Sequence, residues 1–193
     1  RTVMTRHRSK PSFQRQAASL PDRWDLLPLL EQPQQDLESI LKRLDELVSQ
    51  FEGARSRLSP DIASQRLLEI LHLNEDIARQ SAKLSAYAYL WFSENTKDLE
   101  ARAFKTRVEE RLTGLQNRML FFDLWWQGVD DGNATRLLNA SGDYRYYLES
   151  IRRYKPHTLS EAEEKIINLK NTTGRSAVNT LYDILTNGLS FTI

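Results

Sequence analysis

Apolar positions along the chain recur mainly at intervals of three and four residues, the spacing of helices that bury one face. The first such segment begins at Gln34 and ends near Gly53, with a stripe formed by Leu37, Ile40, Leu41, Leu44, Leu47, Val48 and Phe51. Ser59-Pro60-Asp61 then supplies a hydroxyl cap, a proline at the first helical position and a carboxylate at the positive end of the helix dipole. We therefore expect a second helix from about Pro60 to about Phe92.

A third helix should follow, capped by Asn95 or Thr96 and ending near Gly128. Gly114 should weaken it only locally. Turn residues at 130–133 separate it from a fourth helix, expected from about Ala134 to Tyr154 with an irregularity at Ser141-Gly142.

Two shorter helices close the pattern. Ser160 and Glu163 form a capping box that predicts a helix from about Glu161 to Asn171. A last helix is expected over about Gly174 to Thr186, and Phe191–Ile193 alternate as the start of a short strand would. Because short polar connections join the three long helices, these must run up and down against one another. The sequence thus predicts an all-α fold, an elongated antiparallel bundle of about six helices, three of them long.

Composition narrows the function classes. The 27 basic and 26 acidic side chains give a net charge of +1, so no overall field attracts nucleic acid or anionic lipid. No apolar run approaches the roughly 20 residues that cross a bilayer. The chain has no cysteine, which fits a cytoplasmic protein. We expect neither nucleic acid nor membrane as a partner.

The first 23 residues differ from the rest, because they carry six basic side chains and Asp22 as their one acid. We interpret 1–23 as a basic, flexible N-terminal extension and 24–193 as the helical domain. The start at Arg1 suggests trimming or a fragment.

Several side-chain groups are candidate sites. Glu69, His72 and Asp76 share one helix face, but three surface side chains without a ligand from another helix make an incomplete metal site. The tyrosines and arginines of 144–154 alternate as in a stacking surface for nucleic acid, although helix packing with arginines along the surface is the favoured interpretation. His157 precedes a helix start, where a role in the turn is favoured over a substrate contact.

The segment 121–126 is apolar on nearly every side, Asp123 excepted, so a single buried stripe cannot cover it. Either a second packing layer within the domain covers these residues, or they face another domain or a peptide. The candidate interdomain or peptide-facing surface comprises Phe121, Phe122, Trp125, Trp126 and His157.

Three sequence motifs occur in an order that resembles the amino-terminal region of oligoendopeptidase F and its relatives. These are zinc metallopeptidases of the thimet oligopeptidase superfamily. The three motifs are LPDRWDL at 20–26, YLWFSENT at 89–96, and YLE at 147–149 leading into RRYKPHTLSE at 152–161. The last is the most specific, and the resemblance extends from about Leu20 to the end of the chain.

The resemblance implies a catalytic centre in which two histidines one turn apart, with a glutamate between them, hold zinc. None of His7, His72 and His157 begins such a motif, so we expect no catalytic residue, bound cofactor or metal ligand in this chain. Zinc would belong to a catalytic domain beyond Ile193, and the isolated chain should neither bind zinc nor cleave peptides.

The resemblance further implies that these helices form one wall of a channel that admits short peptides, with the catalytic domain and the peptides as partners. The alternative is a free-standing helical module that binds a partner protein and has no enzymatic parent. The coding sequence past Ile193 discriminates the two, because a downstream His-Glu-x-x-His supports the peptidase and a stop codon supports the module.

Overall fold

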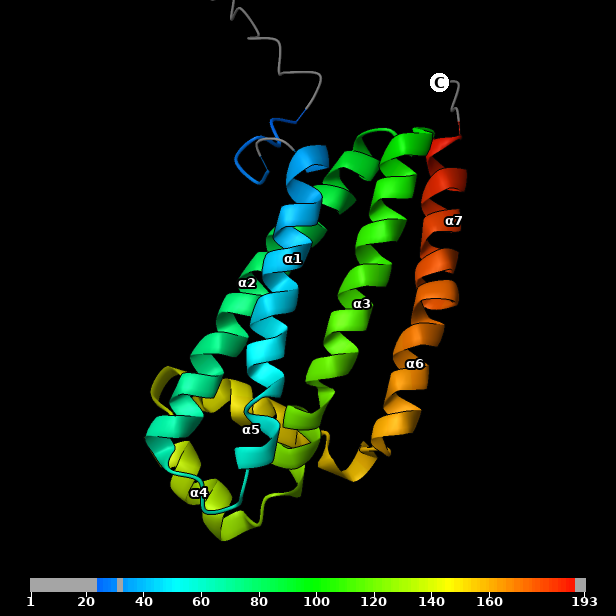
Figure 1. Cartoon of the computed structure of the whole chain (residues 1–193). Coiled ribbons are helices and arrows are strands. Elements are labelled where there is room, and N and C mark those ends of the chain that lie inside the picture. Colours follow the sequence, from blue (N-terminus) through cyan, green and yellow to red (C-terminus); the bar gives the residue numbers. More distant parts are fainter. Residues whose placement is uncertain (1–23, 31–32, 190–193) are drawn as a thin grey trace, which may run out of the picture.

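Three long helices form the body of the molecule in the computed structural model, which describes residues 24–30 and 33–189. They are α1 (Pro33–Glu52), α2 (Ser64–Glu94) and α3 (Leu99–Gly128). Figure 1 shows that they run down, up and down, side by side. The all-α, antiparallel prediction is confirmed, and with α2 and α3 at 31 and 30 residues the bundle is elongated.

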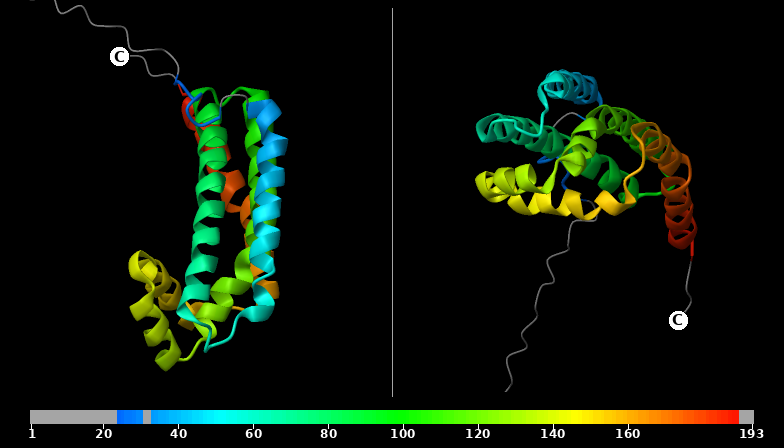
Figure 2. Two further views of the ribbon diagram at one scale, coloured as in Figure 1. Left: turned by 60° about the vertical axis from the view of Figure 1, so that its left-hand side comes forward. Right: turned by 90° about the horizontal axis from the view of Figure 1, so that it is seen from below.

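The remaining helices are shorter. Helices α4 (Asp131–Ala140) and α5 (Arg145–Arg153) lie across the base of the bundle, while α6 (Glu161–Thr173) and α7 (Arg175–Asn187) climb beside α3 (Figures 1 and 2). Single 3-10 turns occur at η1 (Arg55–Arg57), η2 (Gly142–Tyr144) and η3 (Lys155–His157). The described residues therefore hold seven α-helices, one more than expected.

The extra helix arises because the expected helix over Ala134–Tyr154 is divided at the predicted irregularity. Gly142 has a φ of 53°, a left-handed conformation that no helix continues through. Ser141 closes α4 by donating its hydroxyl to the carbonyl of Leu138 at 2.8 Å. The sequence located the break, but the chain turns there instead of bending.

Two predicted helix starts are wrong for a local reason. The Ser59 hydroxyl donates to the Asp61 carboxylate at 2.6 Å instead of capping a helix, and α2 begins only at Ser64. The cap of α3 is neither Asn95 nor Thr96 but Asp98, whose carboxylate accepts the backbone N–H groups of Glu100 and Ala101. Several side chains within four residues could accept the hydrogen bond that caps a helix, and the sequence pattern alone does not show which of them does so.

The start of α6 agrees with prediction. Ser160 accepts the N–H of Glu163, and the Glu163 carboxylate accepts the N–H of Ser160, so the capping box is complete. The basic extension 1–23 and the strand expected at 191–193 lie outside the described residues.

The core runs along α1, α2 and α3 and ends at the base of the bundle. Phe51 of α1 packs against Phe121 and Phe122 of α3, with ring centroids 5.4 and 5.7 Å apart. Leu137 of α4 and Leu148 of α5 are fully buried beneath them. The short basal helices thus close one end of the three-helix core.

Helices α6 and α7 contribute no buried residue to this core. They contact the bundle through polar groups: Asn168 donates to Asn117 at 2.9 Å, and Lys105 donates to Thr180 at 3.2 Å. Most of their large apolar residues are exposed, whereas Ile184 is half-buried and lines a cavity with α3. In α7 the exposed fractions are 65% for Val178, 56% for Leu181, 67% for Tyr182 and 62% for Leu185.

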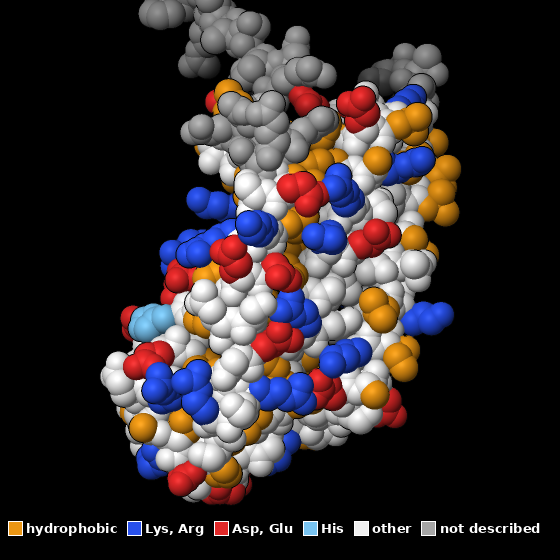
Figure 3. Space-filling view, viewed as in Figure 1, with side chains coloured by type: hydrophobic (Ala, Val, Ile, Leu, Met, Phe, Trp, Pro, Cys, Tyr) orange, Lys and Arg blue, Asp and Glu red, His pale blue; other side chains and the backbone are white. Residues whose placement is uncertain are grey.

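We call this surface the α6–α7 apolar stripe, and it consists of Ile166, Ile167, Leu169, Val178, Leu181, Tyr182, Leu185 and Leu189. Figure 3 shows hydrophobic side chains gathered along the edge of the molecule where these helices lie. An amphipathic helix normally turns its apolar face to the core, so the orientation here is inverted.

Candidate functional site

Two adjoining cavities open along α3, and Asp123 lies between them. The first, of about 380 Å³, is bounded by α2, α3, α5 and α6. The second, also about 380 Å³, lies between α3, α5, η3 and the start of α6. Leu120 and Asp123 line both, and we refer to the pair as the Asp123 cavities.

Asp123 has an unusual environment for a carboxylate. It is half-buried on α3, and within the described part of the chain it has no hydrogen bond or ion pair. Burial, which disfavours the charged form, raises its pKa to about 6. No lysine or arginine is among the described residues that line either cavity. A carboxylate held in this way is a frequent mark of a functional site.

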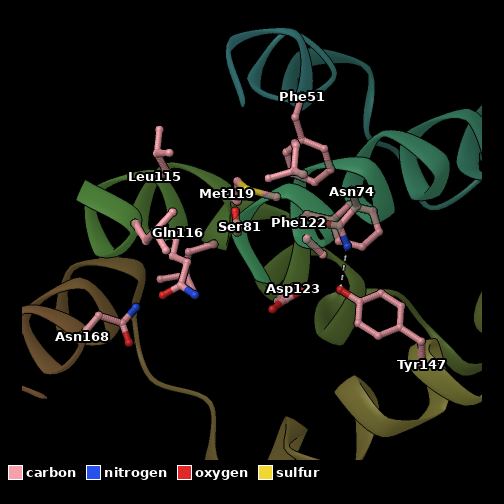
Figure 4. Close-up of a pocket in the computed structure, with 14 residues that line it drawn as sticks. Phe51, Asn74, Ser81, Leu115, Gln116, Met119, Phe122, Asp123, Tyr147 and Asn168 are labelled. Atoms are coloured by element: carbon pink, nitrogen blue, oxygen red, sulfur yellow. Dashed lines mark hydrogen bonds between the residues drawn. The ribbon is translucent and has the colours of Figure 1, made fainter. Parts of the chain in front are cut away.

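The other polar groups of the first cavity include both hydrogen-bond donors and acceptors. Asn74 donates one amide N–H to the Tyr147 hydroxyl at 2.9 Å, and Asn168 donates one to Asn117 at 2.9 Å. Each amide keeps its carbonyl oxygen as an acceptor and its second N–H as a donor. Figure 4 shows Gln116, Asp123 and Asn168 with their polar ends directed into the cavity.

The pKa of the Tyr147 hydroxyl reflects the electrostatics of the first cavity. Burial, and then the negative charge of Asp123, raise the pKa of its hydroxyl to about 12. The hydroxyl therefore stays neutral, and the field around Asp123 is negative. Leu112, Leu115 and Met119, on the same helix as Asp123, supply apolar lining, so the cavity combines apolar and polar surfaces.

The second cavity contains His157 in the turn η3. The backbone N–H of His157 donates to the Tyr154 carbonyl at 2.8 Å, as a residue that forms the turn would, while its side chain lines the cavity. Thr158 and Gln127 form a hydrogen bond of 2.7 Å between the facing walls. A peptide contact at His157 remains a prediction, and the cavity makes it sterically feasible.

The other residues of the expected surface are placed differently. Phe121, Phe122 and Trp126 are buried in the core, where the Trp126 indole donates to the Leu148 carbonyl at 2.8 Å. They form a second packing layer against α1 and α5, the first of the two interpretations of this segment. Phe122 still lines the first cavity and Phe121 a shallow one, but each side chain is nearly fully buried.

Trp125 is half-buried and lies beside a shallow cavity with Arg55 and Glu161, which are paired at 2.7 Å. Its indole N–H has no acceptor among the described residues. Of the five residues expected at a surface, only Trp125 and His157 are accessible.

Asp123, the residue between the cavities, was not singled out as a site. The available signal was a lone acid inside the apolar run 121–126. When a helical segment is apolar on every side except for one carboxylate, that carboxylate faces something other than the bulk core.

The remaining candidate groups take part in packing between helices. Arg152 lies over the Trp126 ring and donates to the carbonyl oxygens of Trp126 and Val129, which agrees with the packing interpretation of the tyrosine and arginine segment. On α2, His72 hydrogen-bonds the Tyr144 hydroxyl at 2.8 Å. Glu69 and Asp76 pair with arginines of their own helix. Within residues 24–30 and 33–189 no three His, Asp or Glu side chains are placed to share a metal ion.

The fold and its cavities together define an all-α helical domain with a ligand-sized site on one long helix. Comparison with protein families matches residues 126–191 to the model of the N-terminal domain described as Oligopeptidase F. This confirms the resemblance over the segment from the end of α3 through α7, which is similar to the N-terminal domain of oligopeptidase F. The sequence motifs at 20–26 and 89–96 lie outside the matched residues.

An N-terminal domain of this family implies a catalytic domain as its partner in the same protein. Searches of curated proteins and of solved structures found no match. None of the helices within the described ranges has both the length and the apolar character required to cross a bilayer.

Proposed function

We propose that this chain is the non-catalytic N-terminal helical domain of an oligoendopeptidase F-like zinc metalloendopeptidase and forms one wall of its peptide channel. The enclosure would restrict substrates to short unfolded peptides in the cytoplasm. Catalysis would occur in the partner domain, where zinc-bound water attacks the peptide bond.

The observation that carries the proposal is the α6–α7 apolar stripe within the segment that matches the family. An exposed apolar surface on two consecutive helices marks a binding site for another protein surface. The opposite, polar face of these two helices already contacts α3. The apolar face is therefore left free to bind another surface. We assign the stripe to the contact with the catalytic domain.

The Asp123 cavities support the channel role from a second direction. They open between α5, α6 and α3, and α5 and α6 belong to the matched segment. A cavity that combines apolar and polar lining suits a peptide side chain with its polar end.

The residues that the structure describes do not provide a zinc site. The described part brings no set of three ligands together, and none of the histidines starts a His-Glu-x-x-His turn. We therefore assign to this chain no step that requires the metal.

The docking assignment can be tested with the double variant Leu181→Glu and Leu185→Glu. Sedimentation velocity of the chain mixed with the separately produced downstream domain should show association for the native chain. We expect the variant to weaken it by about tenfold or more, because two carboxylates would be buried without partners. Leu27→Glu, an equally exposed leucine at the other end of the sequence, is the control and should associate normally.

Peptide cleavage should require both domains and zinc. Zinc-dependent cleavage by the chain alone would contradict the proposal, as would unchanged association of the double variant. The interaction module without an enzymatic parent would use the same stripe. It would be favoured if the coding sequence stops after Ile193.

A further inference from the structure

We propose that the Asp123 cavities bind a primary ammonium group on an aliphatic stem, the group carried by a lysine side chain or by the amino terminus of a peptide. The ammonium recognition stands on the cavity itself. Only the peptide as the carrier rests on the proposed function.

The first argument is the carboxylate without a partner. Asp123 is half-buried, and no cation among the described residues neutralises it. Burying a charge without a partner is costly unless an opposite charge compensates it. A cation that enters the cavity supplies that compensation.

The second argument is the direction of the hydrogen bonds. An ammonium group has three donors and no acceptor. Asn74 and Asn168 each use one amide N–H toward Tyr147 and Asn117, and their carbonyl oxygens stay available as acceptors in the first cavity. Amide and hydroxyl donors are present as well, but the one charged side chain among the described residues that line this cavity is the carboxylate of Asp123, so the site favours a cation over an anion.

The third argument is shape. Leu112, Leu115 and Met119 provide an apolar wall next to the acceptors, and about 380 Å³ accommodates a stem of four or five carbons. A hard divalent ion would require several carboxylates or carbonyls at short range, whereas Asp123 is the one carboxylate among the described residues that line the first cavity. The combined lining fits an amphipathic cation best.

The test is calorimetric titration of the 193-residue chain with pentylammonium, and with 1-pentanol as the neutral probe of the same stem. We expect pentylammonium to bind and 1-pentanol to bind at least tenfold more weakly. Asp123→Asn should weaken pentylammonium binding by about 10- to 100-fold, since a charge-assisted hydrogen bond is lost.

Two further variants separate the site from general effects. Glu110→Gln removes one exposed carboxylate from the same helix and should leave binding unchanged. Ala78→Leu adds volume in the first cavity but keeps Asp123, and it should also weaken binding. Circular dichroism and thermal melting of each variant establish that the fold is retained.

Three peptides of equal length identify the source of the ammonium group: one with a free amino terminus and no lysine, one acetylated with a single lysine, and one acetylated without lysine. The last should not bind. Equal binding of pentylammonium and 1-pentanol, or unchanged binding by Asp123→Asn, would overturn the proposal.

Absence of pentylammonium binding by the full-length peptidase would also overturn the proposal. A side chain of the partner domain would then occupy the cavities. Failure of this proposal is distinguishable from failure of the proposed function. Asp123→Asn leaves the α6–α7 apolar stripe intact, so association with the catalytic domain should be unaffected.

Discussion

Asp123 is the residue where stability and binding oppose each other. Burial raises the pKa of Asp123 to about 6, well above the 3.8 of an exposed aspartate. Unfolding therefore releases a proton between these values, and stability falls as the pH rises through this window. Above the window the charged carboxylate destabilises the fold by about 1–3 kcal/mol, because one unit of pKa corresponds to roughly 1.4 kcal/mol.

Asp123→Asn should therefore stabilise the isolated chain by about 1–3 kcal/mol at pH 7.5, since the variant has no charge to desolvate. At pH 4.5 the gain should be less than half as large. Urea unfolding at the two pH values measures it, and Glu110→Gln serves as the exposed carboxylate for comparison. An equal gain at both values would contradict the assignment of the effect to ionisation.

Residues such as Asp123 show what a one-dimensional pattern leaves open. The apolar run 121–126 indicated that a second layer must cover the helix, and Trp126 with Phe122 meets that expectation through α1 and α5. The pattern could not tell a covering layer within the chain from a partner, because burial depends on residues distant in sequence. His157 reaches a cavity only because η3 turns it toward α3.

At the scale of the element, helix boundaries depend on single backbone positions. Gly142 adopts a φ of 53° between α4 and α5, and a Cβ there would meet no atom within 4 Å. Gly114 lies inside α3, where a Cβ would also meet open space. The two glycines therefore differ in backbone conformation and not in the room around them.

This contrast gives a matched prediction. Gly142→Ala should destabilise the chain by about 1 kcal/mol, because alanine resists the left-handed conformation. Gly114→Ala should stabilise it by about 0.5–1 kcal/mol through helix propensity and a less flexible unfolded chain. Thermal or urea unfolding measures both. Shifts of the same sign would show that the division between α4 and α5 is not fixed by Gly142.

The capping box of α6 illustrates an element that sequence alone predicted well. Its two hydrogen bonds join residues three apart, so no distant contact is needed to form them. The starts of α2 and α3 were predicted less well, because Ser59, Asp61, Asn95 and Asp98 offered competing acceptors. The structure selects among them by local hydrogen bonds, from Ser59 to Asp61 and from the first N–H groups of α3 to Asp98.

At the scale of the whole molecule, stability resides in the three-helix core and not in α6 and α7. Leu84 of α2 is fully buried, whereas Leu181 of α7 is 56% exposed. Leu84→Ala should cost about 2–5 kcal/mol of unfolding free energy. Leu181→Ala should change it by about 0.5 kcal/mol or less in the isolated chain.

Urea unfolding of the two variants tests this division. Leu181→Ala should have a larger effect only when the catalytic domain is present, and that effect should be a weaker association of the two domains. A large destabilisation by Leu181→Ala in the isolated chain would mean that the α6–α7 apolar stripe is buried in solution, and the docking assignment would fail.

The sequence by itself determined the all-α class, the three long antiparallel helices, the box that starts α6 and the place where the fourth helix breaks. Each rests on residues within about one helical turn, or on loops too short to permit another path. Tertiary structure alone decided that Phe121, Phe122 and Trp126 are core, that Asp123 lies between two cavities, and that α6 and α7 face the bundle with their polar sides. These outcomes depend on which helix faces meet, and a periodic stripe states that a face will be covered without stating by what.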